Sequence, residues 1–123
     1  MTTYAIQADG SLTDPKSQSD GQTALCWITP ARGFYYVANT ASNTLSGYTI
    51  AADGQPSLVG TTGIVATTEP GPIDLAASSD GAYLYVLLSA TGQIASFEIG
   101  GSSLKPLNVV SGLPLSLQGI VAR

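Results

Sequence analysis

The side chains that could do chemistry in this chain of 123 residues are mostly carboxylates, because the sequence contains no histidine. A Ser-His-Asp triad, a Cys-His pair and a histidine-bound zinc site are therefore excluded within the chain. Two routes to catalysis remain, namely a carboxylate acting as general base and water activated on a divalent cation. Calcium binds oxygen ligands, which the eight acidic residues and the asparagines could supply.

Three acidic residues are the main candidates. Asp74 opens an otherwise apolar segment, where a carboxylate is costly unless it is hydrogen-bonded or bound to a metal. Glu69 lies in the loop before it, and Asp20 lies in an earlier connection. We expect Asp74 and Glu69 to act as catalytic base or as ligands of calcium or another divalent cation, with Asp20 as a third ligand. The competing interpretation is structural, with Asp74 accepting backbone N–H bonds and Glu69 a solvated charge.

Uncharged candidates complete the expected site. Asn39, Asn43 and Trp27 are expected to contact the substrate, although turn capping for the asparagines and core packing for Trp27 are the alternatives. Cys26 has no basic neighbour in the sequence that would activate it as a nucleophile, and we expect it to be a small buried apolar residue. Three aspartates precede glycine in pairs that are typical of tight turns, and turn formation is their expected role: Asp9, Asp53 and Asp80.

The segments that carry these residues are repeated. Gly33–Asn39 returns as Ala82–Leu88, and Leu45–Ile50 returns as Ile94–Ile99, both at an offset of 49 residues. Tyr4–Gly10 in turn matches Tyr48–Gly54. A period of this length indicates one supersecondary unit used repeatedly.

Each full unit is predicted to hold four short antiparallel strands, as in the blade of a β-propeller. The expected strands of the first unit are residues 24–29, 34–39, 45–51 and 57–61, and those of the second are 73–77, 82–88, 93–99 and 104–110. No helical periodicity is present, so we predict an all-β partial propeller, with a β-sandwich as the alternative. The predicted divisions are 1–23, the second half of a blade; 24–71 and 72–114, two full blades; and 115–123, the first strand of a closing blade.

Three sets of residues resemble the lactonase-like family of seven-bladed propellers, which carries YVTN-type repeats and includes 6-phosphogluconolactonases. Phe34–Thr40 followed by Asn43–Tyr48 is similar to one repeat, and Pro72–Ala76 with Ser79–Gly81 and Leu84–Val86 is similar to the next. Ser111–Pro114 followed by Gly119–Ala122 resembles the carboxyl-terminal closure of that family. The chain thus resembles about the last third of such a propeller.

The resemblance implies a hydrolase that opens a small lactone ring, either a sugar lactone or an acyl-homoserine lactone. The alternative function is a non-enzymatic propeller module that binds a protein or a carbohydrate, because one fold hosts many functions. An open arc of blades leaves a strand ladder and a blade face uncovered. We therefore expect self-association or a complementing propeller chain.

Composition excludes other partner classes. The chain has only four basic residues and a formal net charge of −4, so nucleic acid and anionic membrane are not expected partners. No apolar run approaches the roughly 18 residues of a membrane helix, and the amino terminus lacks the features of a signal peptide. The cytoplasm is then the default compartment, and the single cysteine excludes an intrachain disulfide.

Overall fold

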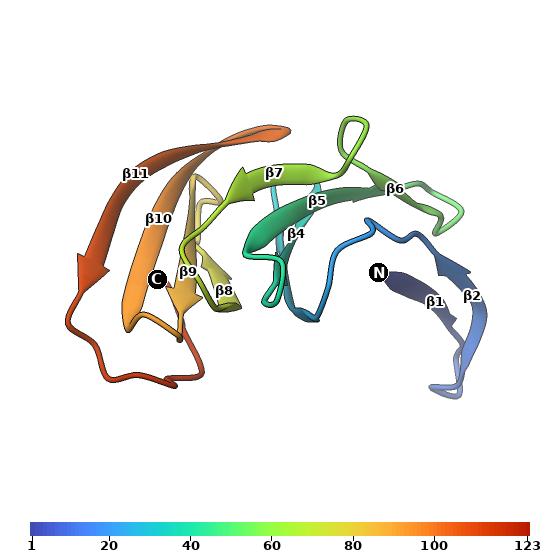
Figure 1. Ribbon diagram of the computed structural model, residues 1–123. Helices are drawn as coiled ribbons and strands as arrows, with labels where there is room; N and C mark the ends of the chain where they lie inside the picture. Colours follow the sequence, from blue (N-terminus) through green and yellow to red (C-terminus); the bar gives the residue numbers. More distant parts are fainter.

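In the computed structural model, which describes residues 1–123, the chain forms eleven β-strands and no helix. The strands make three antiparallel sheets, which follow one another along an open arc (Figure 1). The predicted all-β partial propeller is therefore confirmed. No helix is present that is long and apolar enough to cross a membrane.

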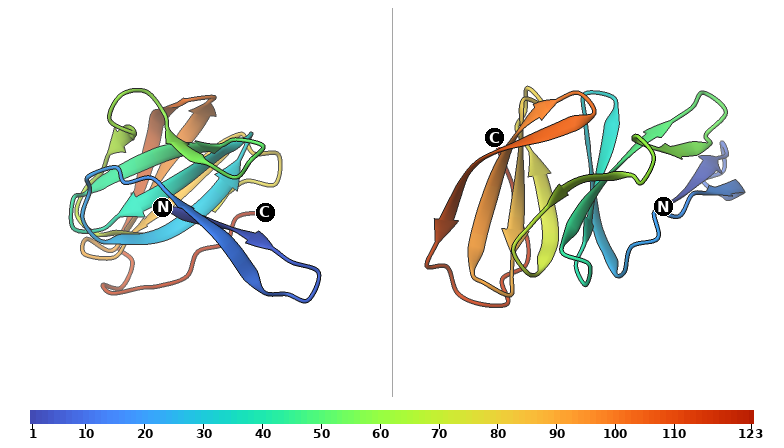
Figure 2. Two further views of the ribbon diagram at one scale, coloured as in Figure 1. Left: turned by 90° about the vertical axis from the view of Figure 1, so that its right-hand side faces the viewer. Right: turned by 45° about the horizontal axis from the view of Figure 1, so that its top comes forward.

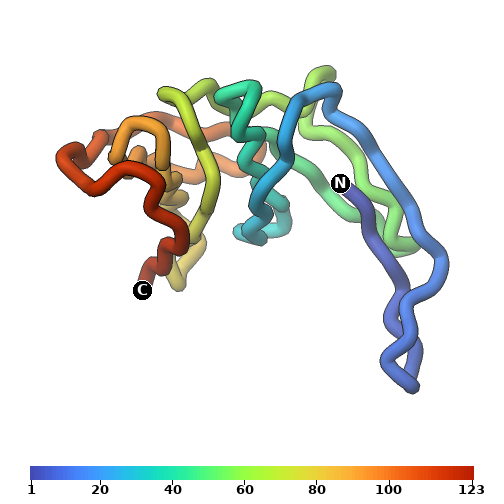
Figure 3. Tube along the Cα trace, turned by 60° about the horizontal axis from the view of Figure 1, so that its bottom comes forward, coloured from blue at the N-terminus to red at the C-terminus, as the bar shows by residue number.

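The first sheet, at the right of Figure 1, is a hairpin of β1 (Thr2–Ile6) and β2 (Leu12–Ser17). We call it the hairpin. It extends away from the rest of the chain (Figure 3) and is attached through polar contacts. The Thr3 hydroxyl donates to the Gly54 carbonyl at 2.6 Å, and Lys16 forms an ion pair with Asp53 at 3.5 Å.

The middle sheet, blade 1, has the strand order β3-β4-β5-β6, with β7 also paired to β5. Its outer strand was predicted as one segment over residues 57–61, and the structure corrects this. The chain leaves the ladder after β6, loops out over residues 59–63 and returns as β7. The strands are β3 (Leu25–Ala31), β4 (Phe34–Asn39), β5 (Thr44–Ile50), β6 (Pro56–Leu58) and β7 (Ile64–Thr67).

The physical reason for the split outer strand lies at Gly47 of β5. The Gly47 N–H donates to the Gly63 carbonyl at 2.8 Å, and its own carbonyl accepts the Val59 N–H at 2.9 Å. A Cβ at Gly47 would lie 2.9 Å from a methyl of Val65 and 3.2 Å from one of Val59. The missing side chain thus makes room for both ends of the loop.

Blade 2 is a regular four-stranded blade with the order β11-β10-β9-β8. Pro106 lies in its outer strand, beside a bulge in the pairing with β10, where a residue without an N–H is tolerated. The strands are β8 (Pro72–Ala77), β9 (Tyr83–Leu88), β10 (Gln93–Gly100) and β11 (Ser103–Ser111).

Residues 112–123 form no strand, including 115–123, where the first strand of a closing blade was expected. This tail runs back across the end of blade 2. The Leu113 N–H donates to the Gly92 carbonyl at 3.0 Å, and the Ser116 N–H donates to the Ser89 carbonyl at 3.0 Å. These bonds hold the tail on the turn between β9 and β10, and the Ile120 N–H then reaches the inner strand β8 by donating to the Asp74 carboxylate at 3.0 Å.

The two blades lie side by side (Figure 2), and the core lies between them. Tyr36, Ala38 and Leu45 of blade 1 pack against side chains of blade 2 that alternate along its strands. Those side chains are Leu84, Val86, Leu88, Ala95, Phe97, Ile99 and Leu104, together with Leu75 of β8. Burial of this apolar surface is the main attraction between the blades.

Side-chain hydrogen bonds cross the same interface, and three of them are 2.8 Å or shorter. The Tyr36 hydroxyl donates to the Gly101 carbonyl at 2.8 Å, and the Thr29 hydroxyl donates to the Leu75 carbonyl at 2.8 Å. The Thr40 hydroxyl donates to the Pro72 carbonyl at 2.6 Å. Because they lie at different positions along the blades, these bonds fix one blade relative to the other.

The first prediction concerns this core. Leu84→Ala removes a fully buried side chain and leaves a cavity between the blades, so the free energy of unfolding should fall by about 2–5 kcal/mol. Urea denaturation followed by circular dichroism measures the change. Leu107→Ala, at a half-exposed position of β11, is the matched control. Equal losses in both variants would mean that the inter-blade core does not carry the stability.

The second prediction concerns the contact between the tail and the turn of blade 2. Gly92 has a φ of 62°, and a Cβ there would collide with the Leu113 carbonyl oxygen. Gly112 also has a positive φ, 87°, but no atom lies near its Cβ position. Gly112→Ala should lower the free energy of unfolding by about 1–3 kcal/mol through backbone strain alone.

Gly92→Ala should lower the free energy of unfolding more than Gly112→Ala does, because the tail must also move away from the turn. Hydrogen exchange at the Leu113 amide measures that displacement directly. Unchanged protection of this amide in Gly92→Ala would contradict the prediction.

Candidate functional site

Asp74 lies on β8, the inner strand of blade 2, and its residue is only 4% exposed. Its Oδ1 accepts the Leu75 N–H at 2.7 Å, and its Oδ2 accepts the Ile120 N–H of the tail at 3.0 Å. These bonds satisfy the carboxylate in a buried position, as the structural interpretation of Asp74 requires. Each carboxylate oxygen keeps further capacity to accept a hydrogen bond.

A hollow of about 440 Å³ lies beside Asp74, between the inner strands of the two blades and the tail. Aromatic, thiol, carboxylate and amide groups meet here. The lining residues are Cys26, Trp27, Ile73, Asp74, Gln118 and Gly119. We call this the inner hollow.

Trp27 and Cys26 are exposed on β3, so the alternative of core packing for Trp27 and the expectation of burial for Cys26 are both wrong. The pairing of β3 with β4 shifts register between Leu25 and Trp27, which leaves Cys26 as the extra residue of a bulge. As the innermost strand, β3 also has no further strand beside it. Trp27, 48% exposed, therefore lines the inner hollow and also a smaller hollow beside Leu25 and Ile28.

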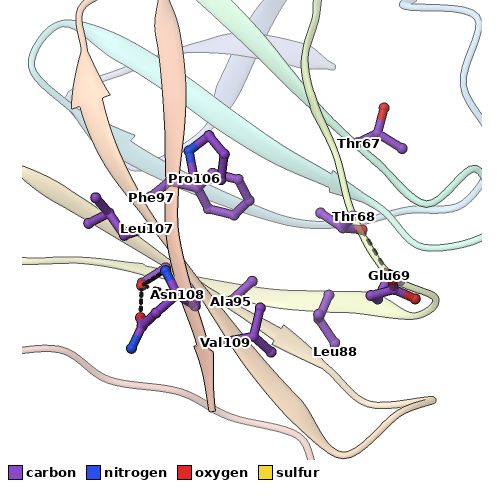
Figure 4. Close-up of a pocket in the computed structure, with 11 residues that line it drawn as sticks. Thr67, Thr68, Glu69, Leu88, Ala95, Phe97, Pro106, Leu107, Asn108 and Val109 are labelled. Carbon is purple, nitrogen blue, oxygen red and sulfur yellow. Dashed lines mark hydrogen bonds between the residues drawn. The ribbon is translucent and has the colours of Figure 1, made fainter. Parts of the chain in front are cut away.

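Glu69 lies elsewhere. It is exposed in the loop between β7 and β8, at the edge of a second groove of about 360 Å³ between the end of β7 and blade 2 (Figure 4). The floor of that groove includes Leu88, Ala95 and Phe97, and Thr67 and Thr68 lie beside Glu69. Asp74 and Glu69, expected to act together, thus line two different hollows.

The two asparagines hold turns and loops. Asn39 is buried, and its amide nitrogen donates to the Thr44 hydroxyl at 3.2 Å and to the Ser46 hydroxyl at 2.8 Å. Asn43 has a φ of 54° in the turn between β4 and β5, and its side-chain oxygen accepts the Gly71 N–H at 3.2 Å. Its carbonyl accepts the Thr68 N–H at 2.9 Å, so Asn43 anchors the loop that carries Glu69. Neither asparagine lines the inner hollow.

Asp20 precedes blade 1, and its Oδ1 accepts the Gln22 N–H at 3.1 Å. Burial acts to raise the pKa of the Asp20 carboxyl, but hydrogen bonding by Ser46 and by the Gln22 N–H outweighs it and the pKa is lowered. Burial, together with the neighbouring Asp20 charge, raises the pKa of the Tyr48 hydroxyl. Asp20 thus belongs to a polar cluster with Ser46 and Tyr48 rather than to the inner hollow.

The three expected metal ligands, Asp74, Glu69 and Asp20, therefore have three separate surroundings. No group of three or more His, Cys, Asp or Glu residues in the chain could hold a metal ion. The turn aspartates have the expected structural role, because Asp9, Asp53 and Asp80 each accept the N–H two residues further on.

Sequence reasoning missed Gln118 and Gly119 as neighbours of Asp74. The signal was present, since Gly119–Ala122 aligns with Asp74–Ala77 as the opening of a blade. Successive inner strands of a propeller are adjacent around its axis. This alignment could therefore have placed the tail beside β8.

Solved structures of similar fold include a candidate 6-phosphogluconolactonase from Bacteroides fragilis, at 20% identity and a TM-score of 0.71, with 89% of this chain and 36% of that chain covered. The periplasmic gluconolactonase PpgL of Pseudomonas aeruginosa is 20% identical with a TM-score of 0.70, and the match covers 96% of this chain and 40% of that chain. A candidate 6-phosphogluconolactonase from Bacteroides uniformis is 14% identical with a TM-score of 0.71, and the match covers 88% of this chain and 35% of that chain.

This chain thus spans between one third and two fifths of the length of these three proteins. No curated protein sequence matches it. The family described as "Lactonase, 7-bladed beta-propeller" matches residues 2–121, nearly the whole chain. The chain therefore belongs to the lactonase family of seven-bladed β-propellers.

Proposed function

We propose that this chain acts in the hydrolysis of a small lactone, with the inner hollow as the binding site. The observation that carries the proposal is the shared position of Trp27 and Asp74 in one hollow between two blades. Membership of the lactonase family supports the reaction class. The names of the similar Bacteroides and Pseudomonas proteins favour a sugar lactone over an acyl-homoserine lactone.

The residues of the inner hollow suit a compact ring with one polar edge. The exposed indole of Trp27 offers a flat apolar surface for the ring, and the Gln118 side chain offers an amide donor and acceptor. Asp74 is held in place by the N–H groups of Leu75 and Ile120. A base fixed in this way loses little conformational entropy when the substrate binds.

In the proposed reaction, Asp74 accepts a proton from water as the water oxygen bonds to the lactone carbonyl carbon. The bond between that carbon and the ring oxygen then breaks, and the proton passes to the ring oxygen. One lactone and one water give one hydroxy acid. The expected divalent cation does not fit the residues of this chain, because its three candidate ligands lie apart, and no step requires it.

A second candidate function is binding without catalysis. The dispersed acidic residues favour it, as does the engagement of both Asp74 oxygens by backbone N–H groups. In that case the inner hollow would hold a carbohydrate ring on Trp27 and release it unchanged.

The third prediction tests catalysis. In a pH-stat titration over sugar lactones and acyl-homoserine lactones, Asp74→Asn should release acid about 10²–10⁴-fold more slowly than the unaltered chain, because the general base is lost. Glu98→Gln, which removes an exposed carboxylate paired with Lys105, is the matched control and should keep the rate. Parallel titrations with calcium and with excess chelator test the divalent cation.

Unfolding curves of both variants separate loss of a base from loss of the fold. Acid release in folded Asp74→Asn at the rate of the unaltered chain would remove Asp74 from the mechanism. No release by the unaltered chain above the uncatalysed rate would favour the binding function.

The fourth prediction tests occupancy of the inner hollow. Trp27 is the only tryptophan and lines the inner hollow, so tryptophan fluorescence reports the surroundings of this one side chain. Addition of a sugar lactone, or of the matching open-chain acid, should change the emission in a saturable way. The Glu69→Gln variant should respond identically, because Glu69 lines the other groove. A flat titration across the panel would contradict binding in the inner hollow.

A further inference from the structure

Both ends of the arc carry apolar faces, one exposed at the hairpin and one partly covered at blade 2. At one end the hairpin presents the leading face, which consists of Tyr4, Ile6 and Leu12, respectively 52%, 76% and 60% exposed. At the other end blade 2 carries the trailing face, which consists of Tyr85, Leu87 and Ile94; Tyr85 and Ile94 are half-buried, and Leu87 is only 2% exposed. These three residues lie on the side of the sheet opposite to the core.

The trailing face repeats a face that is packed inside the molecule. At the repeat offset of 49 residues, Tyr36, Ala38 and Leu45 of blade 1 correspond to Tyr85, Leu87 and Ile94. The blade 1 residues are buried against blade 2. The trailing face therefore has the residue types and the strand positions of a surface that receives another blade.

The leading face repeats the surface that packs on it. By the sequence repeat, Tyr4 and Ile6 correspond to Phe97 and Ile99. Leu12 pairs with Ile6 across the hairpin just as Leu104 pairs with Ile99 in blade 2. The three blade 2 residues are all less than one-tenth exposed, because they contribute to the core against blade 1. Their hairpin counterparts are exposed.

We propose that the leading face of one copy of this chain docks on the trailing face of a second copy. The contact between blade 1 and blade 2 is the template for this interface, since both of its surfaces recur at the free ends of the arc. In the template, Phe97 and Ile99 pack in the cluster that contains Tyr36 and Leu45. In the assembly, Tyr4 and Ile6 of one copy pack on Tyr85 and Ile94 of the next.

A polar contact of the template is also reproduced. The Tyr36 hydroxyl donates to the Gly101 carbonyl, in the turn between β10 and β11. Tyr85 is the counterpart of Tyr36, and its side chain lines an open hollow of about 250 Å³. The hydroxyl of Tyr85 would donate to a carbonyl in the turn that joins the two hairpin strands of the second copy, at Ala8, the counterpart of Gly101.

The tail partly covers the trailing face, and an open hollow remains beside it that the partner's side chains would enter. Residues Ile120–Arg123 line the same hollow as Tyr85 and Ile94, on the side near the inner strand. They take the place of the first strand of a blade, and the docked hairpin supplies the third and fourth. The contact is heterologous, so it joins copies head to tail.

Sedimentation velocity tests the proposal, with the chain at about 1 µM to about 100 µM, a range that detects micromolar association. The unaltered chain should associate as concentration rises. Ile6→Asp on the leading face and Ile94→Asp on the trailing face should each weaken association by roughly tenfold or more, because a charge is buried without a partner. Leu107→Asp, at an exposed apolar position on neither face, should assemble as the unaltered chain does.

Mixing the variants tests the head-to-tail direction. Ile6→Asp keeps its trailing face and Ile94→Asp keeps its leading face, so an equimolar mixture should form one-to-one dimers that grow no further. Circular dichroism checks that each variant is folded. If Ile94→Asp is not folded, Tyr85→Arg serves as a second trailing-face variant.

A single species at the monomer mass across the whole range would overturn the proposal, and would leave these faces to the remaining blades of a longer chain or to another protein. Association of Ile6→Asp at full strength would overturn it as well. A mixture that fails to pair would indicate contact between like faces and would also overturn it.

Discussion

A twisted sheet of four short strands has two faces, and both must be covered for the sheet to be stable in water. Blade 1 and blade 2 meet this constraint for one face each, through the cluster that joins Tyr36, Ala38 and Leu45 to blade 2. The other contacts depend on this packing. The hydrogen bonds from Tyr36, Thr29 and Thr40 form only where the blades are already close, and they select one relative orientation.

The inner hollow is a product of the same arrangement. Its walls come from β3 of blade 1, β8 of blade 2 and the tail, three segments that are separated in sequence. Asp74 connects two of them, because one of its oxygens accepts an N–H from its own strand and the other accepts one from Ile120. The carboxylate is therefore a structural link and a candidate base at the same time, and its geometry depends on where the tail lies.

The repeat made the blades predictable, because strands, Asp-Gly turns and alternating faces are local features that recur at a fixed offset. The asparagines also follow from local rules, since Asn43 adopts the positive φ that suits a turn. The position of Glu69 does not follow from such rules. Periodicity predicts which residues share a strand, but it does not predict the path of a loop of several residues. The exposure of Trp27 depends on a bulge at Cys26 that no feature of the apolar pattern marks.

The split outer strand of blade 1 has a consequence for protein engineering. Both ends of the loop over residues 59–63 are hydrogen-bonded to a single residue, Gly47, so the loop is closed at its base by contacts that do not involve its tip. Thr61 and Thr62 at that tip are exposed. Because the entropy of closing a loop grows only slowly with its length, extra residues here cost little. This rim position is where a peptide epitope or an affinity tag could be displayed with both blades left intact.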